Sequence, residues 1–165
     1  MNDVSEAHAP LTIRAAQADD AAQLAAWAIA MAWETEHKQL DPDIVHRGVR
    51  TAFEQPARGL YFIAECVVDE AVVPVGTLMI TYEWSDWRCG DWWWIQSVYI
   101  APEHRRRGVY RALYDHVHAL AVASPGVCGL RLYVERDNAN AQRTYESLGM
   151  SDAGYAMYED EFARR

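Results

Sequence analysis

The sequence predicts a mixed α/β fold, with helices flanking a sheet, built as one domain. Its 165 residues are enough for one sizeable core and too few for two ordinary domains. Hydrophobic residues make up 51% and charged residues 24%, which excludes the composition of a disordered chain. Segments with helical spacing of apolar residues alternate with runs rich in β-branched and aromatic residues, and this order predicts β-α-α-β-β-β-α-β-α-β.

Residues 1–10 are expected to form a flexible tail, and residues 11–165 the single domain. The first half of that domain is predicted to form one strand, two helices and then three strands in an antiparallel meander. Asp20 and Gln23 have the spacing of a capping box at the start of the first helix, and Asp41 before Pro42 has the pattern of an N-cap. The predicted ranges are 11–15, 20–36, 42–53, 60–68, 73–84 and 92–100.

The second half of the domain is predicted to alternate helices and strands. Apolar residues recur at helical spacing after Gly108 and stop before Ser124. A crossover of this length fits a parallel connection between the strands on either side of it. A helix closed by Gly149 and a final strand are expected to follow. The predicted ranges are 109–120, 127–135, 138–148 and 154–162.

The chain is acidic, with 15 Lys+Arg, 24 Asp+Glu and a formal net charge of −9. That sign argues against a nucleic-acid-binding protein, because such proteins gain much of their affinity by neutralising phosphates. The longest apolar run, residues 21–33, is shorter than a membrane span requires, and the N-terminus lacks the pattern of a signal peptide. The sequence therefore predicts a cytoplasmic protein with no nucleic-acid or membrane partner.

The spacing of cysteine and histidine indicates no metal site. The three cysteines are odd in number and lack metal-ligand spacing, which favours reduced thiols over a disulfide framework. His116 and His118 lie two residues apart on a predicted helix and so face different ways. No metal is expected. The residues considered are Cys66, Cys89, Cys128, His37, His46, His104, His116 and His118.

A basic turn between a strand and a helix is the most informative segment. Residues 102–111 hold four arginines and a single glycine, Gly108, just before the predicted helix. The N–H groups at a helix start are unpaired and lie at the positive end of the helix dipole, so a phosphate can bind there. A solvated basic turn is the alternative interpretation. Because no Gly-Lys-Ser/Thr follows and Gly108 has no companion glycines, a P-loop and a Rossmann fingerprint are excluded.

Two motifs resemble those of the GNAT superfamily of N-acetyltransferases, which use acetyl-coenzyme A. The first, Arg/Gln-x-x-Gly-x-Gly/Ala between a strand and a helix, is matched from Arg105 to Tyr110, where Tyr110 replaces the small residue. The second, Asn-x-x-Ala-x-x-x-Tyr-x-x-x-Gly-Phe, is matched from Asn138 through Tyr145 to Met150, which replaces the phenylalanine. The resemblance covers about residues 10–160.

The resemblance implies a GNAT-like mixed, mainly antiparallel sheet, with a central parallel strand pair splayed at the cofactor site and flanked by helices. It implies acetyl-coenzyme A as the co-substrate. Backbone groups of Val98 and Ile100 would pair with the pantetheine arm, the side chain of Asn138 would contact the arm, and the basic turn would hold the pyrophosphate. The implied cofactor-binding residues are Val98, Ile100, Arg105, Arg106, Arg107, Gly108, Val109, Tyr110, Arg111 and Asn138.

Two kinds of proton-transfer residue are expected. Tyr145 matches the tyrosine that protonates the departing thiolate in many family members, and a phenol with an ordinary pKa of about 10 suits that role. Packing on its helix face is the alternative. The attacking amine must also lose a proton, and a carboxylate is the expected base. For each candidate, a solvated surface acid with no role in catalysis is the alternative interpretation. The candidates are Glu83 and Glu34, placed first, and then Glu36 and Asp86.

Five tryptophans lie between positions 84 and 94. Strand alternation puts Trp92 and Trp94 on one sheet face and Trp93 on the other, so both faces are expected to be covered. Core packing is the first interpretation. An aromatic wall for the acceptor amine, with Glu83, Asp86 and Asp91 supplying negative potential, is the second, and a hairpin edge that forms a homodimer is the third.

The leading functional hypothesis is an N-acetyltransferase that moves an acetyl group from acetyl-coenzyme A to a primary amine by direct attack. The four arginines of residues 104–111 leave 11 basic and 24 acidic residues elsewhere, and this acidic remainder favours a small cationic amine. A protein N-terminus or lysine is the alternative acceptor. A non-catalytic acyl-coenzyme A sensor on the same fold is the competing class.

Overall fold

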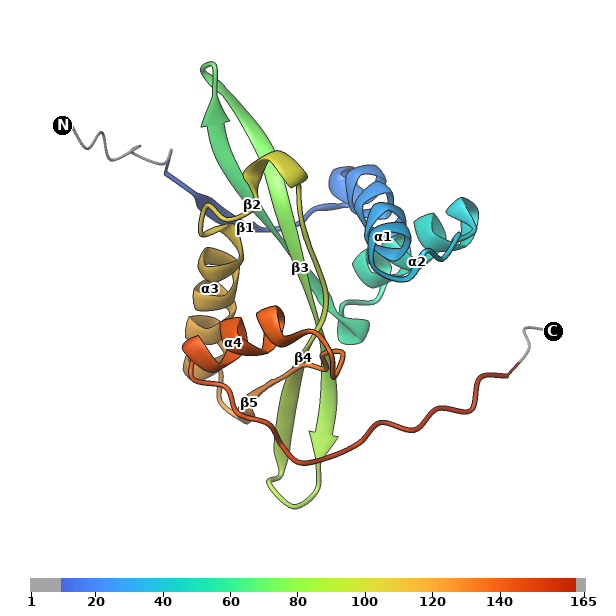
Figure 1. The fold of residues 1–165 in the computed structure, drawn as a ribbon, viewed down its shortest axis with the longest axis vertical. Helices are drawn as coiled ribbons and strands as arrows, with labels where there is room; N and C mark the ends of the chain where they lie inside the picture. Colours follow the sequence, from blue (N-terminus) through green and yellow to red (C-terminus); the bar gives the residue numbers. More distant parts are fainter. Residues whose placement is uncertain (1–9, 163–165) are drawn as a thin grey trace. The chain divides into compact units, whose positions relative to one another are not determined.

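The computed structural model describes residues 10–162. These residues fall into two compact units, with the boundary between Leu132 and Tyr133. The first unit holds the sheet and the helices α1 to α3, and the second holds α4 (Figure 1). All of the predicted N-terminal tail except Pro10 lies outside the described residues.

A five-stranded sheet, in the order β1-β2-β3-β4-β5, is the frame of the first unit (Figure 1). The first four strands pair antiparallel, as the meander pattern predicts, and β4 pairs with β5 in parallel. The chain passes from β4 to β5 through α3 (Val109–Ala123), which confirms the expected crossover. The strands are β1 (Thr12–Ala15), β2 (Leu60–Val68), β3 (Ala71–Ser85), β4 (Gly90–Ile100) and β5 (Val127–Arg131).

The helices α1 (Ala21–Glu36) and α2 (Pro42–Glu54) cover one face of the sheet. Leu24 and Trp27 of α1 and Val49 of α2 are buried in one apolar cluster with Ile63 of β2 and Tyr99 of β4. The ring centroids of Trp27 and Tyr99 lie 6.0 Å apart. Because burying each large apolar side chain contributes about 1.5–3 kcal/mol, this cluster fixes α1 against the last residues of β4.

The start of α2 follows the predicted pattern. Asp41 Oδ1 accepts hydrogen bonds from the backbone N–H groups of Asp43 (2.9 Å) and Ile44 (3.3 Å), and Pro42 is the first helical residue. An aspartate N-cap satisfies donors that have no partner within the helix, and proline at the first position removes one of them.

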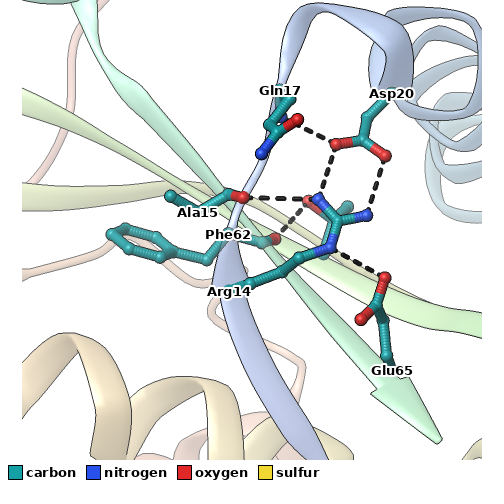
Figure 2. A network of polar contacts seen from close by, with 7 residues as sticks. Arg14, Ala15, Gln17, Asp20, Phe62 and Glu65 are labelled. Carbon is teal, nitrogen blue, oxygen red and sulfur yellow. Dashed lines mark hydrogen bonds and ion pairs between the residues drawn. The ribbon is translucent and has the colours of Figure 1, made fainter.

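The start of α1 differs from the prediction. Figure 2 shows the Asp20 carboxylate held by Arg14, whose Nη1 and Nη2 donate to its two oxygens at 2.7 and 2.9 Å. Arg14 Nε donates to Glu65 on β2 at 2.7 Å, and the backbone N–H of Gln17 also donates to Asp20. The predicted capping box with Gln23 is therefore wrong, because the short turn η1 (Ala18–Asp20) engages the Asp20 carboxylate before α1 begins.

The helix α3 covers the opposite face of the sheet. Val109, Leu113 and Val117 are buried along one side of it, as the apolar spacing predicts. The ring of His116 lies 5.3 Å from that of Phe62, the residue next to Ile63 on β2. Since neighbouring strand residues point to opposite faces, α3 and the α1–α2 pair enclose the sheet between them.

The second unit holds α4 (Ala139–Ser147) and then a segment without regular structure. The final strand predicted over residues 154–162 is wrong: those residues form neither helix nor strand, and Tyr155, Tyr158 and Phe162 are exposed. The segment contains three consecutive acids and Gly154 at φ +75°, both unfavourable for a strand. Within the described residues β5 is consequently the last strand of the sheet, and it ends at Arg131 rather than at the predicted residue 135.

Candidate functional site

The parallel pair of strands stays together over only part of β4. Pairing with β5 covers residues 91–94, and Trp94 opposite Arg131 is its last pair. Residues 95–100 continue along β3 but have no strand on their other side within the described residues. This open edge of β4 lies where the family resemblance implies a splayed strand pair.

A β-bulge marks the beginning of the open edge. Met79 of β3 pairs with Ser97, whereas the next residue, Ile80, pairs with Ile95, so Gln96 is an extra residue on β4. A bulge increases the local twist and turns a strand away from its regular course. The bulge follows the last residue that pairs with β5 by two positions, so the change in β4 and the end of β5 occur together.

The polar backbone groups of the open edge have a defined direction. The N–H of Ala101 donates to Val75 O on β3 at 2.9 Å. In an antiparallel ladder, alternate residues point their N–H and C=O groups to the same side, so those of Tyr99 also face β3. The groups of Val98 and Ile100 consequently face away from β3, into the open edge. An extended ligand laid along this edge can pair with them as a strand would, with Ile100 O already accepting from Arg105 Nε.

The basic turn follows the open edge directly. It begins with the short helix η3 (Pro102–His104) and ends at Gly108, the N-cap of α3. Gly108 has φ +81°, which a glycine adopts readily, and Arg106 has φ +63°, which is uncommon for a residue with a side chain. The four arginines, Arg105, Arg106, Arg107 and Arg111, are exposed around the first turn of α3.

The side chain of Arg105 joins the basic turn to α1 and to the end of β4. Its Nη2 donates to Glu34 Oε2 of α1 at 2.6 Å, and its Nε donates to Ile100 O at 2.9 Å. Its guanidinium lies 5.5 Å from the centre of the Tyr99 ring, and the Tyr99 hydroxyl donates to Glu34 Oε1 at 3.1 Å. The four residues form one network that joins the end of α1, the end of β4 and the basic turn.

This network fixes the charge of Glu34. The hydrogen bond from Arg105 lowers the pKa of the Glu34 carboxyl, and the bond from the Tyr99 hydroxyl acts in the same direction. Burial and the neighbouring Glu34 raise the pKa of Tyr99. Glu34 is therefore a carboxylate, and Tyr99 a neutral phenol, at neutral pH.

Glu83 lies at the other end of the open edge. The Trp94 indole Nε1 donates to its Oε2, and Arg131 Nη1 donates to its Oε1 at 2.8 Å. Both contacts come from the last residue pair between β4 and β5. Trp94 thus joins the carboxylate of Glu83 to the point where the two strands separate.

The predicted alternation of the tryptophans is confirmed. Trp92 and Trp94 lie on the sheet face that carries Glu83, whereas Trp93 lies on the other face with its ring 6.2 Å from that of Tyr82. Trp92, Trp93 and Trp94 are half-buried. The remaining two tryptophans of the group, at the tip of the β3–β4 hairpin, are 61% and 88% exposed and take no part in the core; they are Trp84 and Trp87.

The structure also describes the other predicted site residues. Glu36 is exposed at the end of α1, and Asp86 Oδ1 accepts from the backbone N–H of Trp87 in the hairpin turn. In the second unit, Asn138 is the N-cap of α4, its Oδ1 accepting from Ala141 N at 3.0 Å. Tyr145 lies on the same helix, and burial raises the pKa of its phenol.

Sequence reasoning missed several contacts that define these clusters. The pairing of Arg131 with Glu83 depends on the register of a parallel strand pair, and the bond from Tyr99 to Glu34 joins residues 65 positions apart. The tryptophan-rich run predicted that aromatic residues lie near Glu83, but it gave no sign that Arg131 binds this carboxylate. In the part of the chain described, no three His, Cys, Asp or Glu side chains gather to hold a metal ion, and no helix has the length and apolar character of a membrane span.

The chain belongs to the GNAT family of acetyltransferases. The family's sequence model matches residues 19–150, most of the chain, and includes the open edge of β4, the basic turn and α4. As a member of that family the protein is an N-acetyltransferase that uses acetyl-coenzyme A, which confirms the family and the class of reaction expected from its two motifs.

Solved structures agree with this assignment. A possible acetyltransferase from Clostridium difficile 630 is 40% identical, with a TM-score of 0.83 over 93% of this chain and 99% of that one. An aminoglycoside N-acetyltransferase solved in complex with CoA shares the fold at 15% identity, with a TM-score of 0.73 over 96% and 99% of the two chains. A ribosomal-protein-alanine N-acetyltransferase from Brucella melitensis biovar Abortus 2308 does so at 18% identity, with a TM-score of 0.69 over 93% and 100%. A comparison with curated protein sequences found no match.

Proposed function

We propose that this protein transfers the acetyl group of acetyl-coenzyme A to a primary amine at the open edge of β4. The observation that carries the proposal is the direction of the backbone groups of Val98 and Ile100, which face away from β3 where β5 has ended. The amide groups of a pantetheine arm are matched to such groups, because each can donate or accept a backbone hydrogen bond.

The basic turn supports binding of the pyrophosphate at the end of this edge. The first N–H groups of α3 lie beside Gly108, and the exposed guanidinium groups of Arg106, Arg107 and Arg111 add positive charge around them. The side chain of Arg105 is already bound by Glu34 and Ile100 O, so its contribution to the coenzyme site is to hold the turn in place.

Glu83 is the better of the two first-placed bases. An acceptor that enters as its ammonium ion first loses one proton to become the nucleophilic amine. A C–N bond then forms to the acetyl carbon, the C–S bond breaks, a second proton leaves the nitrogen and the thiolate takes up a proton. Glu83 pairs with Trp92 and is bonded to Trp94, the last residue of β4 that pairs with β5, and it accepts the amine proton directly or through water. Glu34 is the weaker base because Arg105 lowers its pKa.

Tyr145 and Asn138 supply the remaining groups. Since burial raises the pKa of Tyr145, its phenol is protonated at neutral pH and can donate a proton to the thiolate. The Asn138 carbonyl oxygen caps α4, which leaves its amide N–H groups as the donors for the pantetheine arm. These roles require residues 11–165 to act as one domain, and the family match supports this because it runs across the boundary at Leu132.

The proposed acceptor is a small primary amine that enters as its ammonium ion. The acidic balance of the chain outside the basic turn supports this, since it attracts cations over long range. Acetylation of a protein N-terminus or lysine is the second candidate. The three free cysteines fit a cytoplasmic setting, and a homodimer formed through the exposed hairpin stays a prediction from the sequence.

A thiol-release assay tests the proposal. The protein is incubated with acetyl-coenzyme A and a panel of small amines, peptides and aminoglycosides, and free coenzyme A thiol is measured together with the acetylated product. Acetyl-coenzyme A-dependent acetylation of at least one small amine is expected. Coenzyme binding without turnover on any acceptor would favour the sensor class, and no coenzyme binding would refute the proposed site.

A further inference from the structure

Two arginines lie over one tryptophan near the proposed base. The guanidinium carbon of Arg131 is 4.0 Å from the centre of the Trp92 ring, and that of Arg88 is 5.1 Å from it. Arg131 comes from β5 and Arg88 from the hairpin turn before β4, so two separate segments bring a cation to the same indole. A cation–π contact of this kind attracts the guanidinium to the face of the ring and restricts its orientation.

The Trp92 ring has a fixed place in the sheet. It lies over Gly129 of β5, its partner in the parallel ladder, and a Cβ at Gly129 would be 2.7 Å from Trp92 Cζ3. Any side chain at position 129 would displace the indole. The position of the Trp92 ring, which both arginines contact, therefore depends on glycine at position 129.

The two arginines over Trp92 differ in their ion pairs. Arg131 forms an ion pair with Glu83, whose second oxygen accepts from Trp94. Arg88 forms no ion pair with any of residues 10–162, and its side chain is exposed. Arg88 thus lies over Trp92 with no carboxylate bound to its guanidinium among the described residues, although Asp86 and Asp91 are close to it in the chain. The aromatic wall expected to attract a cation is occupied at Trp92 by the protein's own cations.

Arg88 and Trp92 lie near the proposed acceptor site and at the opposite end of β4 from the basic turn proposed for the coenzyme. Trp92 lies on the same face as Glu83 and precedes the bulge at Gln96 by four residues, about 13 Å along a strand. The basic turn lies beyond the other end of β4, after Ile100. A molecule whose amine reaches the bulge can therefore extend its far end toward Arg88.

We infer that the acceptor carries a carboxylate several bonds away from its primary amine, and that Arg88, aligned by Trp92 and Arg131, binds this carboxylate. The inference rests on the proposed function and adds the class of acceptor. A guanidinium matches a carboxylate with two parallel hydrogen bonds. The ammonium end of such a zwitterion still experiences the attraction of the acidic chain, so this acceptor agrees with both charge features.

Three acceptors of equal chain length test the inference: an ω-aminocarboxylate, the corresponding alkylamine and the corresponding diamine. The value of kcat/KM for each is measured by thiol release at saturating acetyl-coenzyme A. The wild-type protein is expected to prefer the aminocarboxylate over the alkylamine by about tenfold, since one charge-assisted contact corresponds to that factor. Arg88→Gln should abolish the preference, and Arg88→Glu should reverse it toward the diamine.

Arg50 supplies the matched control, because it is an exposed arginine of α2 outside this cluster. Arg50→Gln and Arg50→Glu should keep the wild-type order of acceptors. Equal turnover of all three acceptors, or an order that Arg88→Glu leaves unchanged, would overturn the inference and leave the proposed function intact. If none of the three is acetylated while other amines are, the inference also fails; if no amine is acetylated, the proposed function fails with it.

Discussion

Arg105 joins three parts of the first unit through one guanidinium group. It binds the Glu34 carboxylate of α1, the carbonyl of Ile100 on β4 and the face of the Tyr99 ring. Arg131 plays a comparable part at the other end of the open edge, where it binds Glu83 and covers Trp92. Each of the two first-placed bases is therefore held by an arginine: Glu34 by Arg105, which also contacts Tyr99, and Glu83 by Arg131, which also contacts Trp92.

Replacing Glu34 by glutamine should weaken coenzyme binding more than chemistry. Without the carboxylate, Arg105 loses its 2.6 Å ion pair and the basic turn loses its anchor to α1. We expect KM for acetyl-coenzyme A to rise several-fold, with kcat and its pH profile little changed. Steady-state kinetics across pH provides the measurement.

Glu36→Gln is the matched control, since Glu36 is an exposed acid two residues further along the chain. It should leave KM and kcat at wild-type values. A large fall in kcat for Glu34→Gln, with loss of the acidic limb of the pH profile, would instead identify Glu34 as the base.

The ion pair of Asp20 should make stability depend on pH. The hydrogen bonds from Arg14 lower the pKa of Asp20 below its ordinary value of 3.8, so the folded state binds its proton less tightly than the unfolded state does. The stabilisation is therefore present above about pH 4 and is lost as the pH falls through the lowered pKa. We expect Asp20→Asn to reduce the free energy of unfolding by about 1–2 kcal/mol at neutral pH, and by less in acid.

Urea unfolding at neutral pH and near pH 3 measures this difference. The neighbouring Asp19→Asn is the control, because no hydrogen bond or ion pair of the Asp19 side chain is found in the described part of the chain. A loss of stability for Asp20→Asn that is equal at both pH values would contradict the linkage.

At the scale of elements, β4, the basic turn and α3 follow one another directly and form the segment proposed to bind the coenzyme. β4 carries the outward polar groups, and α3 begins at the residue whose left-handed conformation turns the chain, Gly108. The strand, the turn and the helix start must keep their relative positions for a single extended ligand to contact all of them.

Gly108→Ala should lower coenzyme affinity. The φ of +81° costs a residue with a Cβ about 1 kcal/mol, and no atom lies within 4 Å of the added group, so the effect is one of backbone conformation alone. We expect the Kd for coenzyme A, measured by calorimetry, to rise about fivefold or more as the turn relaxes.

Gly126→Ala is the control for this change. Gly126 has φ +84° and equally open surroundings, but it lies between α3 and β5. It should cost similar stability without changing coenzyme affinity. Equal effects of the two substitutions on Kd would show that the turn makes no specific contribution.

The predictability of these elements from the sequence depended on how local their causes are. The strand of residues 60–68 has the predicted bounds, and the N-cap at Asp41 is formed as predicted, because both follow from neighbouring residues. The predicted strand of residues 154–162 failed, since a strand also needs a partner. The bulge at Gln96 and the pairing of Glu83 with Arg131 depend on the register between strands, which no local pattern specifies.

At the scale of the whole molecule, the charge is divided between two regions. Residues 104–111 carry four arginines and no acid, while the rest of the chain has 11 basic and 24 acidic residues. The chain has a net charge of −9, yet the four arginines of the basic turn can attract a polyanion to that one place. Composition predicted the absence of a nucleic-acid partner, and the position of the arginines predicted the anionic ligand.

The proposed catalysis also includes a proton donor to the leaving thiolate, Tyr145. Tyr145→Phe should lower kcat by at least about tenfold, because the thiolate loses its proton donor, and should leave the Kd for coenzyme A unchanged. Thiol release and calorimetry provide the two measurements. Tyr155→Phe is the control, since Tyr155 lies in the same unit and is 86% exposed. Unchanged turnover for Tyr145→Phe would reject its role as the acid.

The position of bound coenzyme A tests the central claim most directly. A crystal structure of the protein with coenzyme A should show the pantetheine amides bonded to the backbone groups of Val98 and Ile100, and the pyrophosphate on the N–H groups beside Gly108. Coenzyme A bound away from the open edge of β4, or on the turn without contact to Val98 and Ile100, would contradict the account.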